Sequence, residues 1–177
     1  NRTVGLSDFH DLPSGVLYEY HWMVENPEKW IEKTEGDHLH LVHVEAIKNW
    51  PKIKLAARQA GGRLGIVFNP LTTLDKVYPY LDERDCVRVL AMTVNPGFDG
   101  QKYIPEVEKN ITALRTRYPE LEIEVDGGIH VQTAEAAASA GANILDAASA
   151  VFSAPDAKAA IESIKKAGEK GFARWKV

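Results

Sequence analysis

Short, apolar, β-rich runs alternate regularly along this chain with longer runs of helical period. Such alternation is typical of βα units built around a parallel sheet. Six units can be counted, with strands predicted at residues 17–23, 39–45, 64–68, 87–94, 121–125 and 143–147. Helices are predicted at residues 26–35, 46–59, 73–81, 104–118, 131–140 and 154–167.

Two α/β architectures fit this rhythm: an open, doubly wound sheet and a closed (β/α)8 TIM barrel. Both place functional groups at the carboxyl ends of the strands. A dinucleotide-binding sheet needs Gly-x-Gly-x-x-Gly after its first strand, whereas the glycine-rich turns here follow late strands, where barrels hold phosphate. The barrel is therefore favoured. Because six units are two short of eight, residues 1–177 are expected to form one barrel domain that is incomplete at its N-terminus.

Glycine-rich turns follow two of the predicted strands. The first, Val-Asn-Pro-Gly-Phe-Asp-Gly-Gln at residues 94–101, contains Gly97 and Gly100. Glycine lets backbone N–H groups converge on phosphate oxygens that bulkier side chains would block. The second turn repeats the arrangement and adds a carboxylate, with Asp126 followed by Gly127 and Gly128. Both turns are thus predicted to bind an anion.

The composition narrows the class of partner. The net charge of −4 is spread along the chain, without a Lys/Arg cluster typical of nucleic-acid or anionic-lipid binding. No apolar run approaches the ~20 residues that span a bilayer, and the N-terminus lacks the pattern of a signal peptide. The single cysteine, Cys86, is expected to be a structural thiol in a reducing compartment. We therefore expect a cytoplasmic protein with a small-molecule or protein partner, no nucleic acid and no membrane.

Several segments together carry a resemblance to a known family. His-Trp-Met-Val-Glu-Asn-Pro at residues 21–27 is similar to a His-Leu-Met-Val-x-x-Pro motif, and His-Val-Glu-Ala at residues 43–46 to the next strand end. Residues 69–73, 92–98, 124–129 and 149–152 keep the same order and spacing. Over nearly its whole length the chain resembles the ribulose-phosphate 3-epimerases, which are phosphate-binding (β/α)8 barrels.

The resemblance implies that strands 3–8 of the barrel are present. The first five residues, Asn-Arg-Thr-Val-Gly, are similar to the segment just after the family's second strand. In the family, the first two strands carry a substrate-binding serine and a His-x-Asp pair, which supplies two metal ligands and one catalytic carboxylate. These groups are expected to lie upstream of Asn1.

The expected reaction is epimerisation at C3 of a ketose phosphate, from D-ribulose 5-phosphate to D-xylulose 5-phosphate. Such a reaction needs a base, an acid and positive charge near the enediolate oxygens. By resemblance, Asp126 is one of the two acid/base carboxylates and a metal ligand, and His21 is a second metal ligand beside the substrate. Histidine and carboxylate suit one divalent ion, Zn²⁺, Fe²⁺, Mn²⁺ or Co²⁺. From the residues alone, Asp126 would more simply cap a helix and His21 would more simply be a core histidine.

The resemblance also assigns the remaining contacts. Met23 and Met92 are expected to form an apolar floor, although plain core packing explains them as well. Of the other histidines, His43 pairs with Glu45 at period 2 and is a candidate for lining the barrel. Structural or surface roles are expected for His38, His40 and His130. The phosphate is expected at Gly97, Phe98, Asp99, Gly100, Gly127, Gly128, Ala148 and Ser149.

Three residues depart from the family pattern. Asp99 stands where the family has glycine, which places a carboxylate in the substrate loop, and Ala148 replaces the glycine of a Gly-Ser pair. Asp146 lies within an apolar strand and would need a partner if buried. Two alternatives stay open. A six-carbon ketose phosphate such as allulose 6-phosphate is a possible substrate because related enzymes share the architecture. Asp99, Ala148 and the absent His-x-Asp strand instead motivate a homologue with impaired turnover that binds sugar phosphates or serves as an assembly subunit. A homo-oligomer is expected, and the aromatic C-terminal tail is expected to dock on the body or on a neighbouring subunit.

Overall fold

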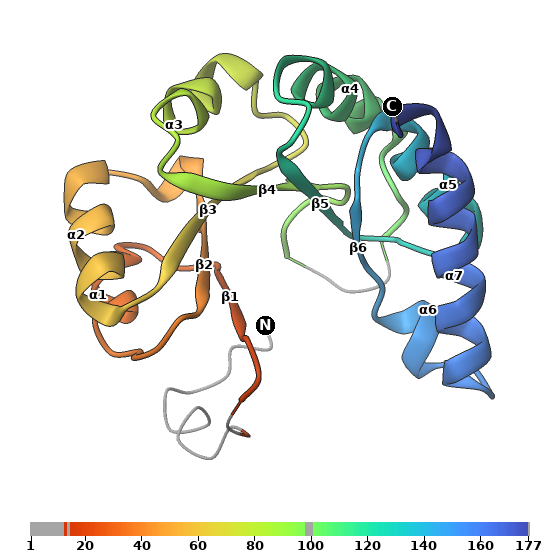
Figure 1. The fold of residues 1–177 in the computed structure, drawn as a ribbon, viewed down its shortest axis with the longest axis horizontal. Helices are drawn as coiled ribbons and strands as arrows, with labels where there is room; N and C mark the ends of the chain where they lie inside the picture. Colours follow the sequence, from red (N-terminus) through yellow and green to blue (C-terminus); the bar gives the residue numbers. More distant parts are fainter. Residues whose placement is uncertain (1–12, 14, 98–100, 177) are drawn as a thin grey trace.

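Six parallel strands form one continuous curved sheet in the computed structural model, which describes residues 13, 15–97 and 101–176. Their spatial order is their order in the chain, so each strand pairs with its sequence neighbours. Figure 1 shows the sheet curling into an arc. The strands are β1 (Glu19–Trp22), β2 (Leu39–His43), β3 (Arg63–Phe68), β4 (Cys86–Met92), β5 (Glu122–Asp126) and β6 (Ile144–Asp146).

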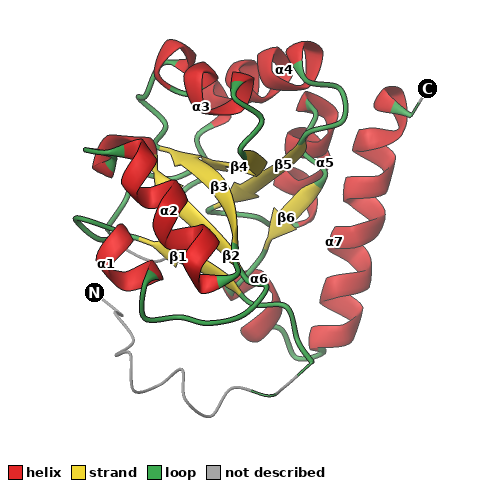
Figure 2. Ribbon diagram, turned by 60° about the vertical axis from the view of Figure 1, so that its left-hand side comes forward, coloured by secondary structure: helices red, strands yellow, loops and turns green. Residues whose placement is uncertain are grey.

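Helices follow the strands and lie on the outer side of the arc, as Figures 1 and 2 show. They are α1 (Glu28–Ile31), α2 (Trp50–Ala60), α3 (Tyr78–Asp82), α4 (Glu108–Arg117), α5 (Val131–Ala140), α6 (Ser149–Phe152) and α7 (Ala157–Phe172). Short 3₁₀ turns cover Val44–Ala46, Leu74–Lys76, Pro105–Val107 and Ala173–Trp175. This repeated strand and helix order confirms a fold of the (β/α) barrel type. Among the described residues, no helix is both long and apolar enough to span a membrane.

Several predicted element boundaries were wrong. The helix predicted at residues 46–59 begins at Trp50, because the Asn49 side chain accepts a hydrogen bond from the Lys52 N–H at 3.0 Å and caps the helix there. The helix predicted at residues 26–35 is only the four-residue α1, and Asn26 adopts a left-handed φ of 54°. Helix α6 was not predicted at all. Local capping geometry therefore set the boundaries more than apolar period did.

The two faces of the sheet are buried against different partners. Alternate strand residues such as Val89 and Ala91 belong to the large cluster that the outer helices complete. The opposite face carries a separate small cluster of five buried side chains, which are Leu39, Leu41, Val67, Leu90 and Met92. A second apolar layer inside the curve is the packing expected of a barrel interior.

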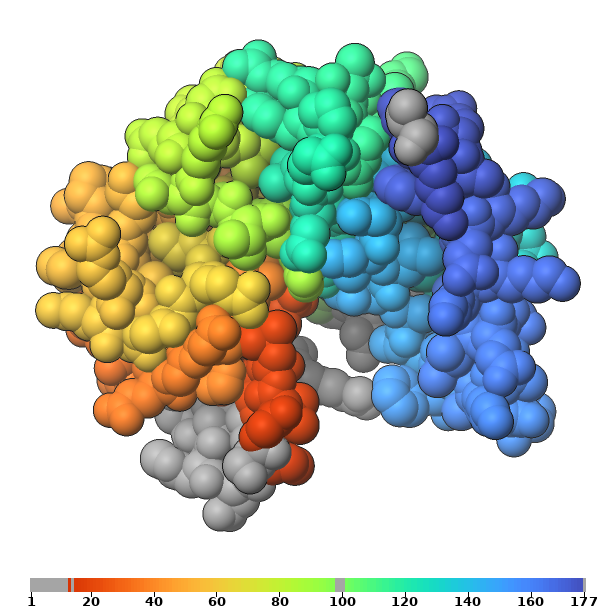
Figure 3. Space-filling model, in the orientation of Figure 1, coloured from red at the N-terminus to blue at the C-terminus, as the bar shows by residue number. Residues whose placement is uncertain are grey.

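The edge strands lie at the two ends of the arc. Among the described residues, β1 pairs only with β2, and β6 pairs only with β5. The space-filling view shows an indentation between the β1 segment and the segment around α6 (Figure 3). At the C-terminus, the Trp175 Nε1–H donates to the Ser139 carbonyl at 3.1 Å, so the tail docks on α5. The prediction that the tail contacts the body of the protein is confirmed.

Candidate active site

Side chains from three strands meet at the carboxyl ends of the sheet, and we call His21, His43 and Asp126 the upper cluster. The Nε2 atoms of His21 and His43 are 2.8 Å apart, and His21 Nδ1 lies 3.9 Å from Asp126 Oδ2. Strands β1 and β5 are separated by three strands in the sheet order, so the contact between His21 and Asp126 crosses the interior of the curve. The curl therefore brings together the two residues that the sequence predicts as metal ligands.

The protonation of the upper cluster follows from its burial. Burial, and then the nearby His43, lowers the pKa of His21 to about 4, so this imidazole is neutral at pH 7. Burial, followed by the carboxylates of Asp146 and Glu19, raises the pKa of Asp126 to about 6. A carboxylate with a pKa near neutrality can both take up and release a proton under physiological conditions.

The second glycine turn is fixed beside Asp126 by the strand end of β4. The Thr93 hydroxyl donates to the Asp126 carbonyl at 3.0 Å and to the Gly127 carbonyl at 2.7 Å. Gly127 and Gly128 have φ values of 121° and 66°, a region that L side chains rarely adopt. A Cβ on Gly128 would also lie 2.8 Å from the backbone nitrogen of Tyr103. The loops after β4 and β5 are thus in contact.

The other predicted substrate contacts are placed less completely. Gly97 is exposed with a φ of 133°, whereas Phe98, Asp99 and Gly100 lie outside the described residues. Ala148 and Ser149 are exposed and follow β6 after one intervening residue, Ala147. The placement of these residues as a phosphate site stays a prediction.

The two methionines differ sharply in exposure. Met92 is 3% exposed in the inner apolar cluster and is aligned with Asp126 in the sheet register. Met23 lies just past the end of β1 and is 58% exposed. Their joint role as a pocket floor also stays a prediction, with Met92 placed directly beside the upper cluster.

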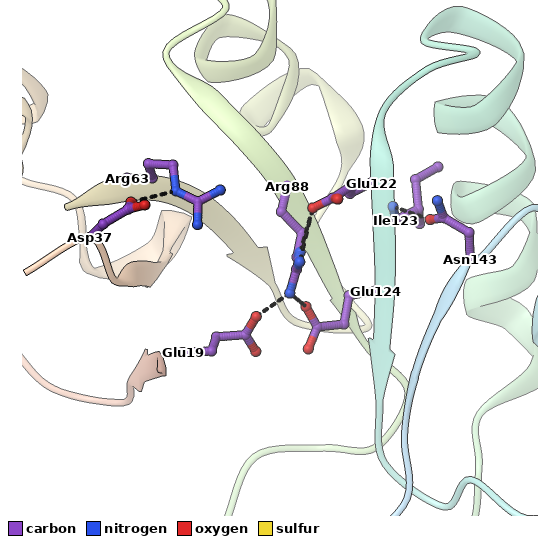
Figure 4. A network of polar contacts seen from close by, with 8 residues as sticks. All are labelled: Glu19, Asp37, Arg63, Arg88, Glu122, Ile123, Glu124 and Asn143. Atoms are coloured by element: carbon purple, nitrogen blue, oxygen red, sulfur yellow. Dashed lines mark hydrogen bonds and ion pairs between the residues drawn. The ribbon is translucent and has the colours of Figure 1, made fainter. Parts of the chain in front are cut away.

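A second polar group lies lower in the interior, around Arg88, and we call Glu19, Arg88, Glu122 and Glu124 the lower cluster. Arg88 pairs with Glu19, with Glu122 at 3.0 Å and with Glu124 at 3.1 Å (Figure 4). Burial, and then Asp146 and Glu19, raises the pKa of Glu124. Oxygens of Glu19, Glu124 and Asp146 lie within 4.8 Å of one another, which is compatible with cation binding, but the Arg88 guanidinium already provides positive charge there.

Arg88 was not among the residues predicted from the sequence. Arg88 is the only charged residue in the run from Val87 to Met92, and this could have revealed it. Because side chains alternate between the two faces of a strand, Arg88 lies on the same face as Met92. No partner for Asp146 could be predicted from the sequence. In the structure, Asp146 contributes to the raised pKa values of both Glu124 and Asp126. It therefore belongs to the boundary between the two clusters.

The remaining histidines and the cysteine have separate environments. His43, a candidate lining residue, contacts His21, and its Nδ1 lies 3.4 Å from Glu45 Oε2. His40 is fully buried and accepts a hydrogen bond from the Trp22 indole at 3.2 Å, which fits the structural role expected of it. Cys86 is buried, and burial raises the pKa of its thiol, as expected of a structural cysteine.

Comparison with known proteins identifies the family of this chain. Residues 3–152 match the model of the ribulose-phosphate 3 epimerase family. The chain belongs to this family. It is 39% identical over 175 residues to a cytoplasmic isoform of ribulose-phosphate 3-epimerase from Oryza sativa subsp. japonica, covering 96% of this chain and 77% of the relative. It is 38% identical to the ribulose-phosphate 3-epimerase of Bacillus subtilis, covering 88% of this chain and 72% of the relative.

A third relative in the same family matches a shorter part of the chain. The ribulose-phosphate 3-epimerase of Methanocaldococcus jannaschii is 39% identical over 153 residues, covering 84% of this chain and 64% of the relative. The epimerases to which the chain is similar are isomerases that act on carbohydrates, and the chain is an enzyme of this class. This chain spans roughly two thirds to three quarters of the length of these three relatives.

Solved structures support the fold independently. Orotidine 5'-monophosphate decarboxylase from Sulfolobus solfataricus superposes with a TM-score of 0.65 at 15% identity, covering 86% of this chain and 73% of that one. 3-Hexulose-6-phosphate synthase from Salmonella typhimurium superposes with a TM-score of 0.56 at 21% identity, covering 75% of this chain and 62% of that one. At these identities the likeness concerns the fold alone.

Proposed function

We propose that the upper cluster forms part of the active site of a metal-dependent ketose-phosphate 3-epimerase, with D-ribulose 5-phosphate as substrate and D-xylulose 5-phosphate as product. The observation that carries the proposal is the 3.9 Å approach of His21 Nδ1 to Asp126 Oδ2 across the interior, beside the turn at Gly127. The pentose substrate is supported by the three relatives described above, each of which is a ribulose-phosphate 3-epimerase.

Asp126 is proposed to move the proton at C3. A base in this role must be ionised while it takes the proton and must release it readily afterwards, which a pKa of about 6 allows. Met92, which is aligned with Asp126 in the sheet register and is 3% exposed, places an apolar side chain beside this residue. As a second carboxylate is required on the opposite face of the substrate, Asp126 acts as one member of a pair.

The donor atoms of the upper cluster fit a divalent metal ion. His21 is neutral at pH 7, as a metal-binding imidazole must be, and Asp126 offers a carboxylate oxygen nearby. We propose these two residues as ligands to Zn²⁺, Fe²⁺, Mn²⁺ or Co²⁺. When bound, such an ion would stabilise negative charge that develops on the substrate oxygens.

The substrate phosphate is proposed to bind above the sheet among three segments, which are residues 97–100, residues 127–128 and residues 148–149. The contacts of Thr93 with the carbonyls of Asp126 and Gly127 support this arrangement, because they hold the loop after β5 against the end of β4. Backbone N–H groups freed by glycine can then point at the phosphate.

We further propose that β1–β6 are strands 3–8 of an eight-stranded barrel. Within the described part of the chain, the outer edges of β1 and β6 pair with no further strand, which supports this numbering, since two more strands between them would close the sheet. A closed barrel would exclude water from the interior where Asp126 works. A homo-oligomeric state and a cytoplasmic location are proposed because the chain belongs to the epimerase family and is similar to a cytoplasmic isoform.

The proposal is tested by converting D-ribulose 5-phosphate to D-xylulose 5-phosphate with full-length protein and added divalent cation. Asp126→Asn removes the proton-transfer group and should lower kcat by about 10²- to 10⁴-fold. Asp75→Asn, the same chemical change at an exposed residue of the 3₁₀ turn before α3, should leave kcat unchanged. Activity of Asp126→Asn equal to that of Asp75→Asn would refute the assigned role.

A further inference from the structure

Four side chains form a continuous line that begins outside the upper cluster and ends in it. Glu45 follows β2, His43 ends it, His21 lies on the neighbouring strand β1, and Asp126 lies across the interior. Successive distances along this line are 3.4 Å from Glu45 Oε2 to His43 Nδ1, 2.8 Å between the two Nε2 atoms, and 3.9 Å from His21 Nδ1 to Asp126 Oδ2. Each imidazole therefore uses both of its ring nitrogens.

The two imidazole rings meet edge to edge. Their planes are 16° apart and their centroids 4.9 Å apart. The 2.8 Å contact between nitrogens is shorter than the spacing of stacked aromatic rings, so the rings lie side by side in nearly one plane. In that plane the nitrogen lone pair and the N–H bond point outward from the ring. The contact thus has the geometry of an N–H···N hydrogen bond, which holds a single proton.

The far end of the line is held by Glu45. Its Oε1 accepts the Asn69 N–H at 3.0 Å and the Thr72 hydroxyl. Burial alone would raise the pKa of Glu45, but the hydrogen bonds from His43, Thr72 and Asn69 outweigh burial and lower it to about 2. Glu45 is thus an anion that only accepts hydrogen bonds. His43 Nδ1 must therefore carry a proton to interact favourably with it.

The tautomers of the two histidines then follow in sequence. With its proton held on Nδ1 by Glu45, His43 presents the lone pair of its Nε2 to His21. The proton of His21 must then lie on Nε2, which leaves its Nδ1 lone pair facing Asp126. We propose that Glu45 and His43 are positioning residues that fix the tautomer and ring orientation of His21, so that Nδ1 is presented to a cation bound with Asp126. The cation in this inference rests on the proposed function, whereas the tautomers do not.

The tautomers can be read without any metal. In water, neutral histidine favours the Nε2–H form, so His43 in the Nδ1–H form would be the minority state imposed by Glu45. Long-range ¹H–¹⁵N correlation spectra of the ¹⁵N-labelled, metal-free protein should show Nδ1–H for His43 and Nε2–H for His21. A scalar coupling between the two Nε2 nuclei should report the shared proton. His43 in the Nε2–H form, or His21 protonated on Nδ1, would overturn the inference.

A matched pair of variants tests the part played by Glu45. Glu45→Gln replaces a pure acceptor with a group that also donates, so His43 should shift toward the Nε2–H form and lose its coupling to His21. Glu25→Gln makes the same change at a side chain that is 85% exposed and should leave both tautomers as they were. Unchanged tautomers in Glu45→Gln would refute the role of Glu45. If this variant fails to fold, the wild-type spectra still test the tautomers proposed for His43 and His21.

Metal titration separates this inference from the proposed function. Co²⁺ binding, followed by visible absorption, should be about 10- to 100-fold weaker in Glu45→Gln than in Glu25→Gln, the usual effect of removing an outer-shell partner of a ligand. If the tautomers are as predicted but Co²⁺ leaves the His21 resonances unperturbed, His21 is not a ligand. The proposed function then fails, while the control of the His21 tautomer by Glu45 and His43 is upheld. If Co²⁺ binds at His21 equally well in both variants, Glu45 does not prepare His21 for metal binding and the inference fails.

Discussion

The upper and lower clusters lie on the same strands, yet they handle charge in opposite ways. Glu19 and His21 are two residues apart on β1, and Glu124 and Asp126 are two residues apart on β5, so each pair shares a face of the sheet. In the lower cluster, Arg88 ties together Glu19, Glu122 and Glu124 (Figure 4). In the upper cluster, the only ion pair recorded for Asp126 within the described ranges is with His21, which is neutral at pH 7.

The two clusters therefore have different roles. A guanidinium that bridges three carboxylates supplies the interior with its own cation, so the lower cluster serves the fold. A carboxylate and a neutral imidazole without a fixed positive partner among the described residues suit a cation and a substrate that come from solution. Two residues along a strand thus separate a structural charge network from a candidate catalytic one.

Removing the cation of the lower cluster should have the largest effect. Arg88→Met leaves the buried carboxyl group of Glu124 without its hydrogen-bond donor and Glu19 without its cation, and should lower the free energy of unfolding by about 3 kcal/mol. The change is measured by urea denaturation at pH 7. Arg63→Met is the control, because the pair between Arg63 and Asp37 is exposed and should contribute at most about 1 kcal/mol. Equal losses in both variants would contradict a structural role for Arg88.

The upper cluster should instead depend on the backbone of its loops. Gly128→Ala forces a side chain into φ 66° and against the Tyr103 backbone. Gly61→Ala is the matched control, with φ 78° and its nearest contact at 3.8 Å. The control should cost about 1 to 2 kcal/mol of unfolding free energy. Gly128→Ala should cost at least about 1 kcal/mol more because of overpacking. The same cost in both would mean that the contact between the two loops is not tight.

Neutralising Asp126 should stabilise the metal-free protein. Its pKa rises from 3.8 to about 6 on folding, so between these pH values the folded state binds more protons, and stability falls as pH increases. After allowance for the 35% exposure of the side chain, Asp126→Asn should gain about 1 kcal/mol at pH 7.5. The gain should disappear below pH 4, as measured by denaturation with a chelator present. A loss of stability at pH 7.5 would show that the carboxylate has a structural partner.

The smallest effect is expected at the exposed end of the lower cluster. The Glu122 side chain is 48% exposed, so Glu122→Gln removes a solvent-screened pair with Arg88 and should cost less than about 1 kcal/mol. Because such pairs are weakened by salt, the difference from wild type should shrink further in 1 M NaCl. A cost that is large and independent of salt would place Glu122 in the buried part of the network.

The fold was largely predictable because parallel βα units leave a strong local pattern. Mostly buried strands such as β3 and β4 appear as apolar runs, and glycine closes helix α2 at Gly61 in the left-handed conformation. The boundaries were less predictable. Helix α2 starts at its Asn49 cap, and Pro79 in the first turn of α3 follows a separate 3₁₀ turn. The starting points of these helices depend on individual hydrogen bonds, which the spacing of apolar residues does not reveal.

The candidate site was predictable only in part, because it combines distant strands. The sequence pointed to His21 and Asp126 separately, but their approach across the interior follows from the curl of the whole sheet. The pairing of His43 with His21 depends on where adjacent strands end, which neither strand reveals alone. Arg88 was missed because its three carboxylate partners come from two other strands.

The central claim is that Asp126 and its neighbours exchange the proton at C3 of a ketose phosphate. The most direct test is to incubate full-length protein and a divalent cation with D-ribulose 5-phosphate in D₂O, and to follow deuterium at C3 by NMR. The account predicts incorporation of deuterium at C3 by the wild-type protein and a loss of at least about 10²-fold in its rate for Asp126→Asn. No incorporation with Zn²⁺, Fe²⁺, Mn²⁺ or Co²⁺, or undiminished incorporation by Asp126→Asn, would contradict it.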